Sequence, residues 1–214
     1  MVLIFDVDGT LLDTYMVTFN CVVASFKKVL PGFNLTKDII VSFFGPPIVQ
    51  RFEEVSGSKQ LALKLYDAYN EHFDLVHDKI VKKFKYSENV LKQLKKMNIK
   101  LAVYSNKVKS RIIRGFECVN FMKYFDYILG VDEVIKPKPD PEGIFKVISV
   151  FGEDRYIYIG DSITDIICAN NANIESIGIS LGLYSCEQLK QANASYVVED
   201  FKKLLEVIKC MIVS

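Results

Sequence analysis

The sequence has few of the residues that build a zinc site or a Ser-His-Asp triad. Only two histidines occur in the 214 residues, His72 and His77, and neither follows a predicted strand. Five cysteines are scattered along the chain without a C-x-x-C pair, at Cys21, Cys118, Cys168, Cys186 and Cys210. This pattern argues against zinc chemistry, a serine triad and a disulfide framework. We therefore expect free thiols in a reducing compartment, with the cytoplasm as the location.

Long apolar runs and an excess of one charge are missing as well. No run approaches the roughly 20 residues of a membrane span, and the opening "MVLIF" is too short for a secretory signal. The net charge is +1, so no basic field favours nucleic acid as the main partner. Half of the residues are hydrophobic, which suffices for a packed core. A small-molecule partner fits these properties, while the oligomeric state is not indicated.

The order of strand and helix patterns predicts an α/β fold. Residues 2–7 form a short apolar run typical of a buried strand. Further strand candidates follow at 99–104, 125–129, 156–159, 174–179 and 196–198, with helical stretches between them. Strands that alternate with helices indicate a Rossmann-like parallel sheet covered on both faces.

The segment between the first strand and the others has a different character. Residues 15–84 show helical periodicity, broken at Gly45-Pro46-Pro47 and at Gly57, and no strand pattern. Ser87 is a candidate N-cap for the helix that follows. We predict an α/β core formed by residues 1–14 and 85–214, with an inserted all-helical domain at 15–84. Eight lysines between Lys79 and Lys100 leave two interpretations open, a site for an anionic partner or, with more weight, a solvated helix face beside a domain hinge.

Polar residues follow four of the predicted strands. In an open parallel sheet, ligands bind beyond the carboxyl ends of the strands. The residues at these positions are Asp6, Asp8 and Thr10 after the first strand, Ser105 and Asn106 after 99–104, Lys136 after 125–129, and Asp161 and Asp165 after 156–159. We therefore expect carboxylates, hydroxyls and an ammonium to meet at one edge of the sheet.

The spacing of the acids suggests a metal site. Asp6 and Asp8 are two apart, so both side chains lean to one side of an extended segment. Asp161 and Asp165 are four apart and share a face if a helix begins at Ser162. Carboxylates at close quarters resist ionisation unless a cation offsets their charge. Mg²⁺ prefers oxygen ligands and takes one or two carboxylates together with a substrate phosphate, so the pattern favours Mg²⁺ as the cation.

These motifs resemble those of a known family. D-x-D-G-T at 6–10, the serine of "VYSNK", the lysine of "KPKP" and "GDSITD" are similar, in order and spacing, to the four motifs of the haloacid dehalogenase-like (HAD) phosphohydrolases. The resemblance covers nearly the whole chain. The helical insertion resembles the cap of the phosphoglycolate phosphatase-like branch, and "FFGPPI" at 43–48 resembles its cap loop. The resemblance implies a Mg²⁺-dependent phosphatase that hydrolyses a small phosphorylated metabolite through an aspartyl-phosphate.

The resemblance also implies roles for the acids. Asp6 would be the nucleophile, which divides one difficult displacement into two easier ones. Asp8 would protonate the leaving oxygen and then deprotonate the attacking water. Asp6, the backbone carbonyl of Asp8 and Asp161 would hold Mg²⁺, with Asp165 one layer further out.

The remaining motif residues would contact the phosphoryl group. Ser105 and nearby backbone N–H groups would bind phosphoryl oxygens, and Lys136 would offset negative charge. In the K-P-x-P pattern the functional lysine comes first, so Lys138 is expected to point to solvent. Thr10 and Asn106 are left open between turn formation and contact with the ligand.

Four other functions were weighed. A phosphosugar mutase shares the scaffold and would require a sugar bisphosphate. A 2-haloacid dehalogenase is disfavoured because Asp8 is acidic. A GDSL-type esterase is disfavoured because no histidine follows His77. A non-catalytic binding protein is disfavoured by the intact motifs. These motifs do not identify the substrate, although Phe43, Phe44 and Arg51 in the insertion are candidates to contact it.

Overall fold

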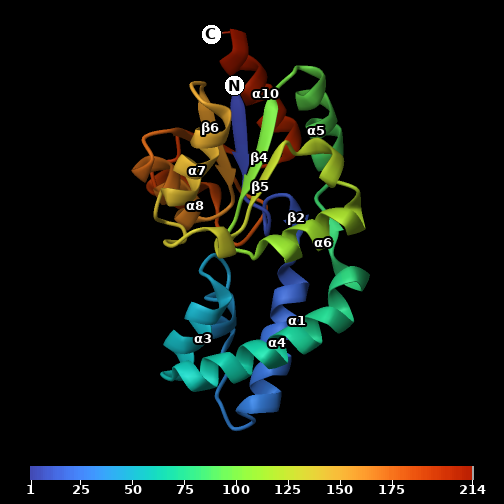
Figure 1. Cartoon of the computed structure of the whole chain (residues 1–214), viewed down its shortest axis with the longest axis vertical. Helices are drawn as coiled ribbons and strands as arrows, with labels where there is room; N and C mark the ends of the chain where they lie inside the picture. Colours follow the sequence, from blue (N-terminus) through green and yellow to red (C-terminus); the bar gives the residue numbers. More distant parts are fainter. Residues whose placement is uncertain (214) are drawn as a thin grey trace. The chain divides into compact units, whose positions relative to one another are not determined.

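A six-stranded parallel sheet forms the centre of the larger part of the chain (Figure 1). The computed structural model describes residues 1–213. The sheet order is β5-β4-β1-β6-β7-β8, with parallel pairing throughout. The strands are β1 (Val2–Phe5), β4 (Lys100–Tyr104), β5 (Tyr127–Leu129), β6 (Tyr156–Gly160), β7 (Glu175–Ile179) and β8 (Tyr196–Val198). The predicted Rossmann-like α/β core is therefore confirmed.

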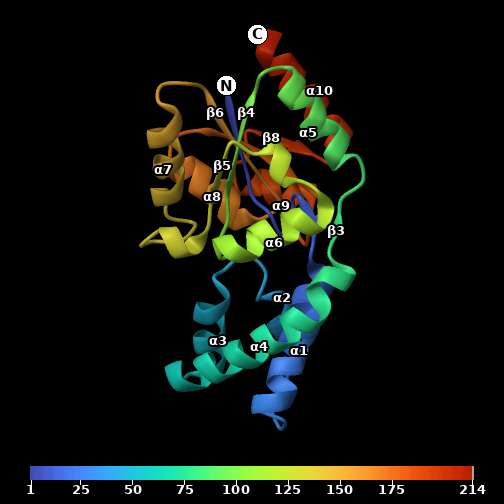
Figure 2. The ribbon, with the colours of Figure 1, turned by 45° about the vertical axis from the view of Figure 1, so that its right-hand side comes forward.

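Helices cover both faces of this sheet. The pair α5 (Ser87–Lys96) and α10 (Phe201–Val213) lies on one face, and α7 (Glu142–Phe151) and α8 (Ile163–Asn171) lie on the other (Figure 2). The remaining helices of this part are α6 (Lys109–Val119), α9 (Cys186–Gln191) and the short 3₁₀ turns Met122–Tyr124 and Val131–Glu133. Because both faces are covered, the central strand β1 is a continuous apolar run, buried at every residue, rather than an alternating pattern.

Alternate strand residues on the α7–α8 side build one hydrophobic core. The cluster joins Val2 and Ile4 of β1 to residues of the flanking strands and of the two helices. Two large members are Tyr104 of β4 and Tyr158 of β6, which are both fully buried. This core fixes the carboxyl ends of β1, β4 and β6 beside one another.

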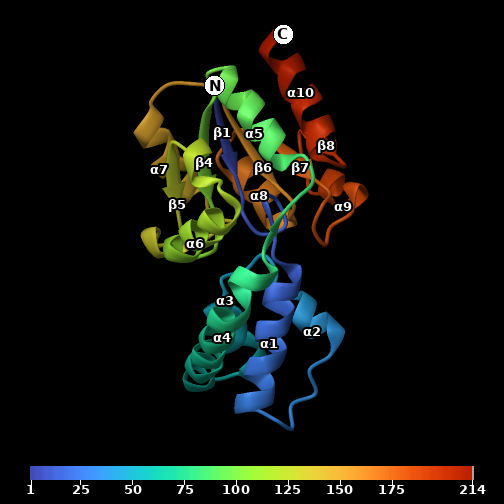
Figure 3. The same cartoon turned by 90° about the vertical axis from the view of Figure 1, so that its right-hand side faces the viewer.

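Residues Thr14–Val81 form a second compact unit of their own. It contains α1 (Tyr15–Val29), α2 (Lys37–Val41), α3 (Ile48–Ser56) and α4 (Lys59–Ile80), and α1 lies along α4 (Figure 3). Its core is aromatic, with Phe26, Phe43, Phe52, Tyr69 and Phe73 buried. The chain enters this unit after Asp13 and leaves it before Lys82, compared with the expected range 15–84.

Two local features differ from the predictions. A two-residue strand, β2 (Leu12–Asp13), pairs antiparallel with β3 (Lys82–Lys83), and β3 lies inside the segment 15–84 for which no strand is predicted. Such a pair is too short to leave an alternating pattern. Ser87 is the first residue of α5 and not its N-cap, because Tyr86 occupies that position with φ at 68°. The Ser87 hydroxyl donates instead to the Phe84 carbonyl at 2.7 Å.

Some of the clustered lysines have acidic neighbours. Lys83 pairs with Glu88, and Lys95 lies 2.8 Å from Asp126. These contacts lie on the surface and do not decide between the two interpretations of the lysine-rich segment. Within the described part of the chain, no helix has both the length and the apolar character needed to cross a membrane.

Candidate active site

Asp6 lies directly after the central strand β1, at the edge of the sheet. Its backbone N–H donates to the Ile159 carbonyl at 2.9 Å, which continues the pairing with β6. The side chain is buried, with 7% of the residue exposed. One carboxylate oxygen, Oδ1, accepts from Lys138 Nζ at 2.8 Å, and the Ser105 hydroxyl also donates to this carboxylate. Asp6 is therefore held rigidly at the carboxyl end of the sheet.

The lysine at this site is Lys138, and the expectation that Lys136 lies there is wrong. The Lys138 ammonium is buried and contacts Asp6 Oδ1 at 2.8 Å and Asp165 Oδ1 at 2.6 Å. Lys136 has a side chain that is 71% exposed, and its nearest acid is Asp140 at 3.9 Å. The second lysine of "KPKP" therefore occupies the position that the sequence analysis assigned to the first.

Backbone clamps explain this register. Asn106 Oδ1 accepts from the Lys138 N–H at 3.0 Å, and Asn106 Nδ2 donates to the Lys138 carbonyl at 3.2 Å. The Glu142 carboxylate accepts from the N–H groups of Ile135 and Lys136 at 2.9 to 3.1 Å. These contacts hold Lys138 against the sheet edge and Lys136 over the surface. The Asn106 side chain thus orients a loop, a role that sequence reasoning missed.

Asp161 follows β6 and is enclosed by glycines. Its Oδ1 accepts from the Thr10 hydroxyl at 2.9 Å. A Cβ atom added to Gly9 would lie 2.2 Å from Asp161 Oδ2, and one added to Gly182 would lie 1.8 Å from it. Gly9 also has φ at 79°, which favours glycine. Gly182, in the loop after β7, carried no signal in the sequence because its contribution is the space that it leaves empty.

Asp165 is oriented by the start of α8. Ser162 is the N-cap, and its hydroxyl accepts from the Asp165 N–H at 3.2 Å. Asp165 Oδ2 in turn accepts from the Ser162 hydroxyl at 2.7 Å and from the Ser162 N–H at 3.1 Å. This reciprocal capping box leaves Oδ1 for Lys138. Asp165 is therefore both a helix cap and a partner of the buried ammonium.

The three buried acids form one cluster. Asp6, Asp161 and Asp165 each offer an oxygen atom, and these atoms all lie within 4.8 Å of one another. Burial raises the pKa of Asp6 to about 6, while Lys138 lowers it in part and Asp165 raises it further. Burial, followed by the charges of Asp165 and Asp6, also raises the pKa of Asp161 well above its usual value. Lys138 alone therefore does not offset the cost of ionising all three acids.

This donor set fits a hard divalent cation. It consists of oxygen atoms, as Mg²⁺ prefers. When all three acids are ionised, the single ammonium leaves two negative charges unbalanced, which a divalent ion would offset. The glycines beside Asp161 prevent a side chain from filling the space next to its outer oxygen.

Asp8 lies at the rim of this cluster. Its Oδ1 accepts from Lys107 Nζ at 2.7 Å, and one third of the Asp8 side chain is exposed, at 33%. Lys107 is only 10% exposed. Asp8 thus keeps contact with solvent, as a group that exchanges protons requires. Lys107, the last residue of "VYSNK", is expected from the sequence to follow the strand at 99–104, but no role is predicted for it.

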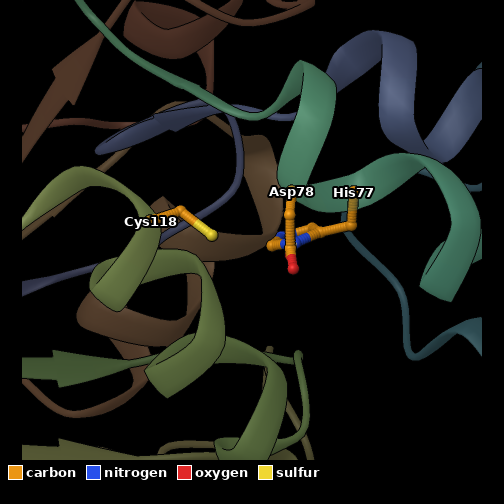
Figure 4. Close-up of side chains that lie close together, drawn as sticks. All are labelled: His77, Asp78 and Cys118. Atoms are coloured by element: carbon orange, nitrogen blue, oxygen red, sulfur yellow. The ribbon is translucent and has the colours of Figure 1, made fainter.

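The histidines belong to the helical unit and not to the acid cluster. Figure 4 shows His77 beside Asp78 near the end of α4, where His77 Nδ1 lies 2.7 Å from Asp78 Oδ1. His77 is fully buried and stacks on Phe73 with ring centroids 4.4 Å apart. We interpret it as a packing residue of the helical core.

The parallel sheet thus ends in a buried aspartate, a buried lysine and a cluster of acids, and this arrangement can be compared with known families. The family model for haloacid dehalogenase-like hydrolases matches residues 3–179. The chain therefore belongs to the haloacid dehalogenase-like hydrolases, and it is an enzyme of the phosphatase type within that family.

Individual proteins resemble the chain over nearly its full length. A candidate pyrophosphatase PpaX of Caldanaerobacter subterraneus is 31% identical over 209 residues, which cover 96% of this chain and 93% of the relative. The pyrophosphatase PpaX of Oceanobacillus iheyensis is 29% identical, with coverage of 96% and 95%. The crystal structure of a predicted phosphatase from Clostridium acetobutylicum superposes on this chain with a TM-score of 0.85. The two sequences are 27% identical, and 97% of each chain is covered.

Proposed function

We propose that the protein is a Mg²⁺-dependent phosphohydrolase that acts on a small phosphorylated metabolite through a phosphorylated Asp6. The observation that carries this proposal is the Asp6 carboxylate, fixed at the end of the central strand and 2.8 Å from the buried Lys138 ammonium. A carboxylate in this setting is oriented for attack, and its charge is offset without being removed.

The proposed reaction has two displacement steps. In the first, an Asp6 oxygen forms a bond to phosphorus while the bond to the leaving oxygen breaks, and Asp8 gives its proton to that oxygen. In the second, Asp8 takes a proton from water, the water oxygen attacks phosphorus, and Asp6 is released as a carboxylate together with inorganic phosphate. The exposed edge of Asp8 and its contact with Lys107 suit this exchange.

The other residues would bind and orient. Asp6, Asp161 and the backbone carbonyl of Asp8 would hold Mg²⁺, which when bound offsets the negative charge of the nucleophile and the phosphate. The Ser105 hydroxyl would bind a phosphoryl oxygen. Thr10 donates to Asp161 and Asn106 holds the Lys138 backbone, so both would position other groups rather than contact the substrate.

Pyrophosphate is the first substrate to test. The relatives that match the chain over nearly their full length carry the name pyrophosphatase. A phosphoanhydride and a phosphomonoester present the same phosphoryl group to Asp6, so phosphoglycolate is the natural comparison. We propose that the Thr14–Val81 unit is the cap domain that the family resemblance predicts.

The test is hydrolysis by the purified protein of pyrophosphate, phosphoglycolate and p-nitrophenyl phosphate, each with Mg²⁺ and with EDTA. We expect turnover of at least one compound with Mg²⁺ and none with EDTA. Asp6→Asn should be inactive and should not be labelled by beryllium with fluoride. Asp67→Asn, an equivalent change at an exposed position on α4, should retain activity. Full activity in EDTA, or an active Asp6→Asn variant, would refute the proposal.

A further inference from the structure

The Lys138 ammonium has three N–H donors, and the structure provides three acceptors for them. Two are carboxylate oxygens, from Asp6 at 2.8 Å and Asp165 at 2.6 Å. The third is the hydroxyl of Tyr158, at 3.0 Å. Tyr158 belongs to β6 and is fully buried. Its hydroxyl completes the set of contacts that fixes the direction of the lysine side chain.

A backbone carbonyl sets the direction of the Tyr158 hydroxyl. The hydroxyl donates to the carbonyl of Tyr104 at 2.6 Å. Asp165 Oδ1 lies further away, at 3.4 Å. Since a phenol has one proton, donation to the carbonyl leaves its oxygen lone pairs to accept from Lys138. The last residue of β4 is thereby linked through Tyr158 to the ammonium beside Asp6.

Tyr104 offers an internal comparison with Tyr158. Both tyrosines are fully buried, and their rings lie 5.7 and 5.5 Å from Lys138 Nζ. The two rings contact each other edge to face, with centroids 6.5 Å apart. Among the described residues, however, the Tyr104 hydroxyl has no hydrogen-bond partner. The two residues thus share ring packing and differ in what the hydroxyl does.

We infer that Tyr158 is a positioning residue, whose hydroxyl holds the Lys138 ammonium between Asp6 and Asp165 and so keeps the Asp6 carboxylate oriented for attack on phosphorus. The inference rests on the proposed function. Lysine is a point charge on a flexible four-carbon stem, so its direction depends on the acceptors around it. Removal of the hydroxyl leaves a buried donor without a partner and lets the ammonium turn.

The test compares Tyr158→Phe with Tyr104→Phe in hydrolysis of p-nitrophenyl phosphate with Mg²⁺. We expect Tyr158→Phe to lower kcat about 10-fold or more, the effect of losing a hydrogen bond to a charged group. KM should stay close to the wild-type value, because the contact acts on the nucleophile and not on substrate binding. Tyr104→Phe should keep wild-type kcat. Equal kcat in the two variants would overturn the inference.

A double-mutant cycle separates positioning from general packing. In a Lys138→Met background, Tyr158→Phe should lower kcat no further, because the hydroxyl acts through the lysine. A loss in that background as large as in the wild type would show that the hydroxyl acts on something else, and would overturn the inference.

A measurement on the Lys138 side chain needs no turnover. In ¹⁵N-lysine-labelled protein, the Nζ protons of Lys138 should exchange slowly with water in the wild type and in Tyr104→Phe, and rapidly in Tyr158→Phe. Equal exchange in both variants would contradict the positioning role. A wild-type protein that hydrolyses no phosphate would refute the proposed function, while this exchange test of the contact would still decide the inference.

Discussion

Lys138 carries a positive charge that is buried away from solvent. Its side chain is 3% exposed and its ammonium lies against two carboxylates, whereas the Lys136 side chain is 71% exposed. A buried ion pair that loses one partner leaves an uncompensated charge, at a cost of roughly 3–5 kcal/mol. An exposed lysine contributes about 0–1 kcal/mol.

The first prediction compares these two lysines. Lys138→Ala should lower kcat by about 10²–10³, the usual effect of removing one preorganised electrostatic stabiliser, and should lower the urea midpoint of unfolding. Lys136→Ala should leave both quantities close to wild type. Steady-state kinetics and urea denaturation measure the two effects. A Lys136→Ala variant with the larger loss would contradict the structure of this loop.

The second prediction concerns Gly182. Alanine at this position would place its Cβ 1.8 Å from Asp161 Oδ2, so the carboxylate must move. We expect Gly182→Ala to weaken Mg²⁺ binding. The Mg²⁺ concentration needed for half-maximal rate should rise at least 10-fold, as is common when residues that orient metal ligands are changed. Gly32→Ala is the control, because nothing lies within 4 Å of its added Cβ. Equal Mg²⁺ requirements in the two variants would refute this role.

For single residues, the sequence predicts the acids of the site but not the residues that hold the site in place. Asp6 and Asp161 follow fully buried strands, and their position at the sheet edge is set by that pattern. Lys136 and Lys138 each precede a proline, so local preference is the same for both. The contacts that separate them come from Asn106 and Glu142, and no spacing in the sequence records those contacts.

At the scale of elements, the start of a helix can serve stability alone or the site as well. Two helices begin with a serine N-cap in a capping box, α8 at Ser162 and α9 at Ser185. The partner of Ser185 is Gln188, on the surface. The partner of Ser162 is Asp165, which also binds Lys138.

The third prediction follows from this pair of caps. Ser162→Ala and Ser185→Ala should each lose about 1 kcal/mol of stability, which lowers Tm by roughly 2–4 °C in a chain of this size. Only Ser162→Ala should also lower kcat, because it frees the Asp165 carboxylate to turn away from the ammonium. Calorimetry and kinetics on the same samples distinguish the two effects. An equal kcat in both variants would mean that the cap does not reach the site.

Long apolar elements were predictable, and short ones were not. The strands of the sheet appear in the sequence because burial on both faces requires unbroken apolar runs. The two-residue strands β2 and β3 have an exposed lysine pair and form through tertiary contact, so no local pattern precedes them. Tyr86 at the N-cap of α5 is likewise a tertiary choice, since tyrosine with φ at 68° goes against local preference.

For the whole molecule, the acid cluster links stability to pH and to metal. The Asp6 pKa in the folded protein is about 6, above its unfolded value of 3.8. A raised carboxylate pKa contributes stability that is fully present below the unfolded value and is lost as pH rises through the folded one. The pKa of Asp161 shifts in the same direction. The metal-free protein therefore loses stability from this cluster between about pH 4 and pH 7.

The fourth prediction is that Mg²⁺ raises Tm more at pH 8 than at pH 5. A ligand that binds only the folded state stabilises it by mass action, and the carboxylates bind the ion when they are deprotonated. Scanning calorimetry with EDTA and with Mg²⁺ at the two pH values measures the difference. Asp161→Asn should reduce the gain at pH 8. A larger Tm gain from Mg²⁺ at pH 5 than at pH 8 would contradict the assignment of the acid cluster as the Mg²⁺ site.

The predicted division of the chain came from periodicity, which changes from strand-like to helical after the first strand and back again near residue 87. The observed crossings, after Asp13 and after Val81, lie within a few residues of the expected ones. The exact residues at which the chain crosses between the two units depend on the β2–β3 pair, which no sequence pattern predicts.

The central place of β1 has a consequence for synthesis. β1 is translated before the other strands of the sheet, yet its two neighbours are β4 at Lys100–Tyr104 and β6 at Tyr156–Gly160. The apolar residues Val2–Phe5 therefore have no strand partner until β4 has been translated, and one of their two edges stays unpaired until β6 follows. The four helices of Thr14–Val81 are contiguous and complete long before that moment. We expect protease applied to ribosome-stalled chains of increasing length to find the helical insertion protected first, and the N-terminal strand only after β6 has emerged.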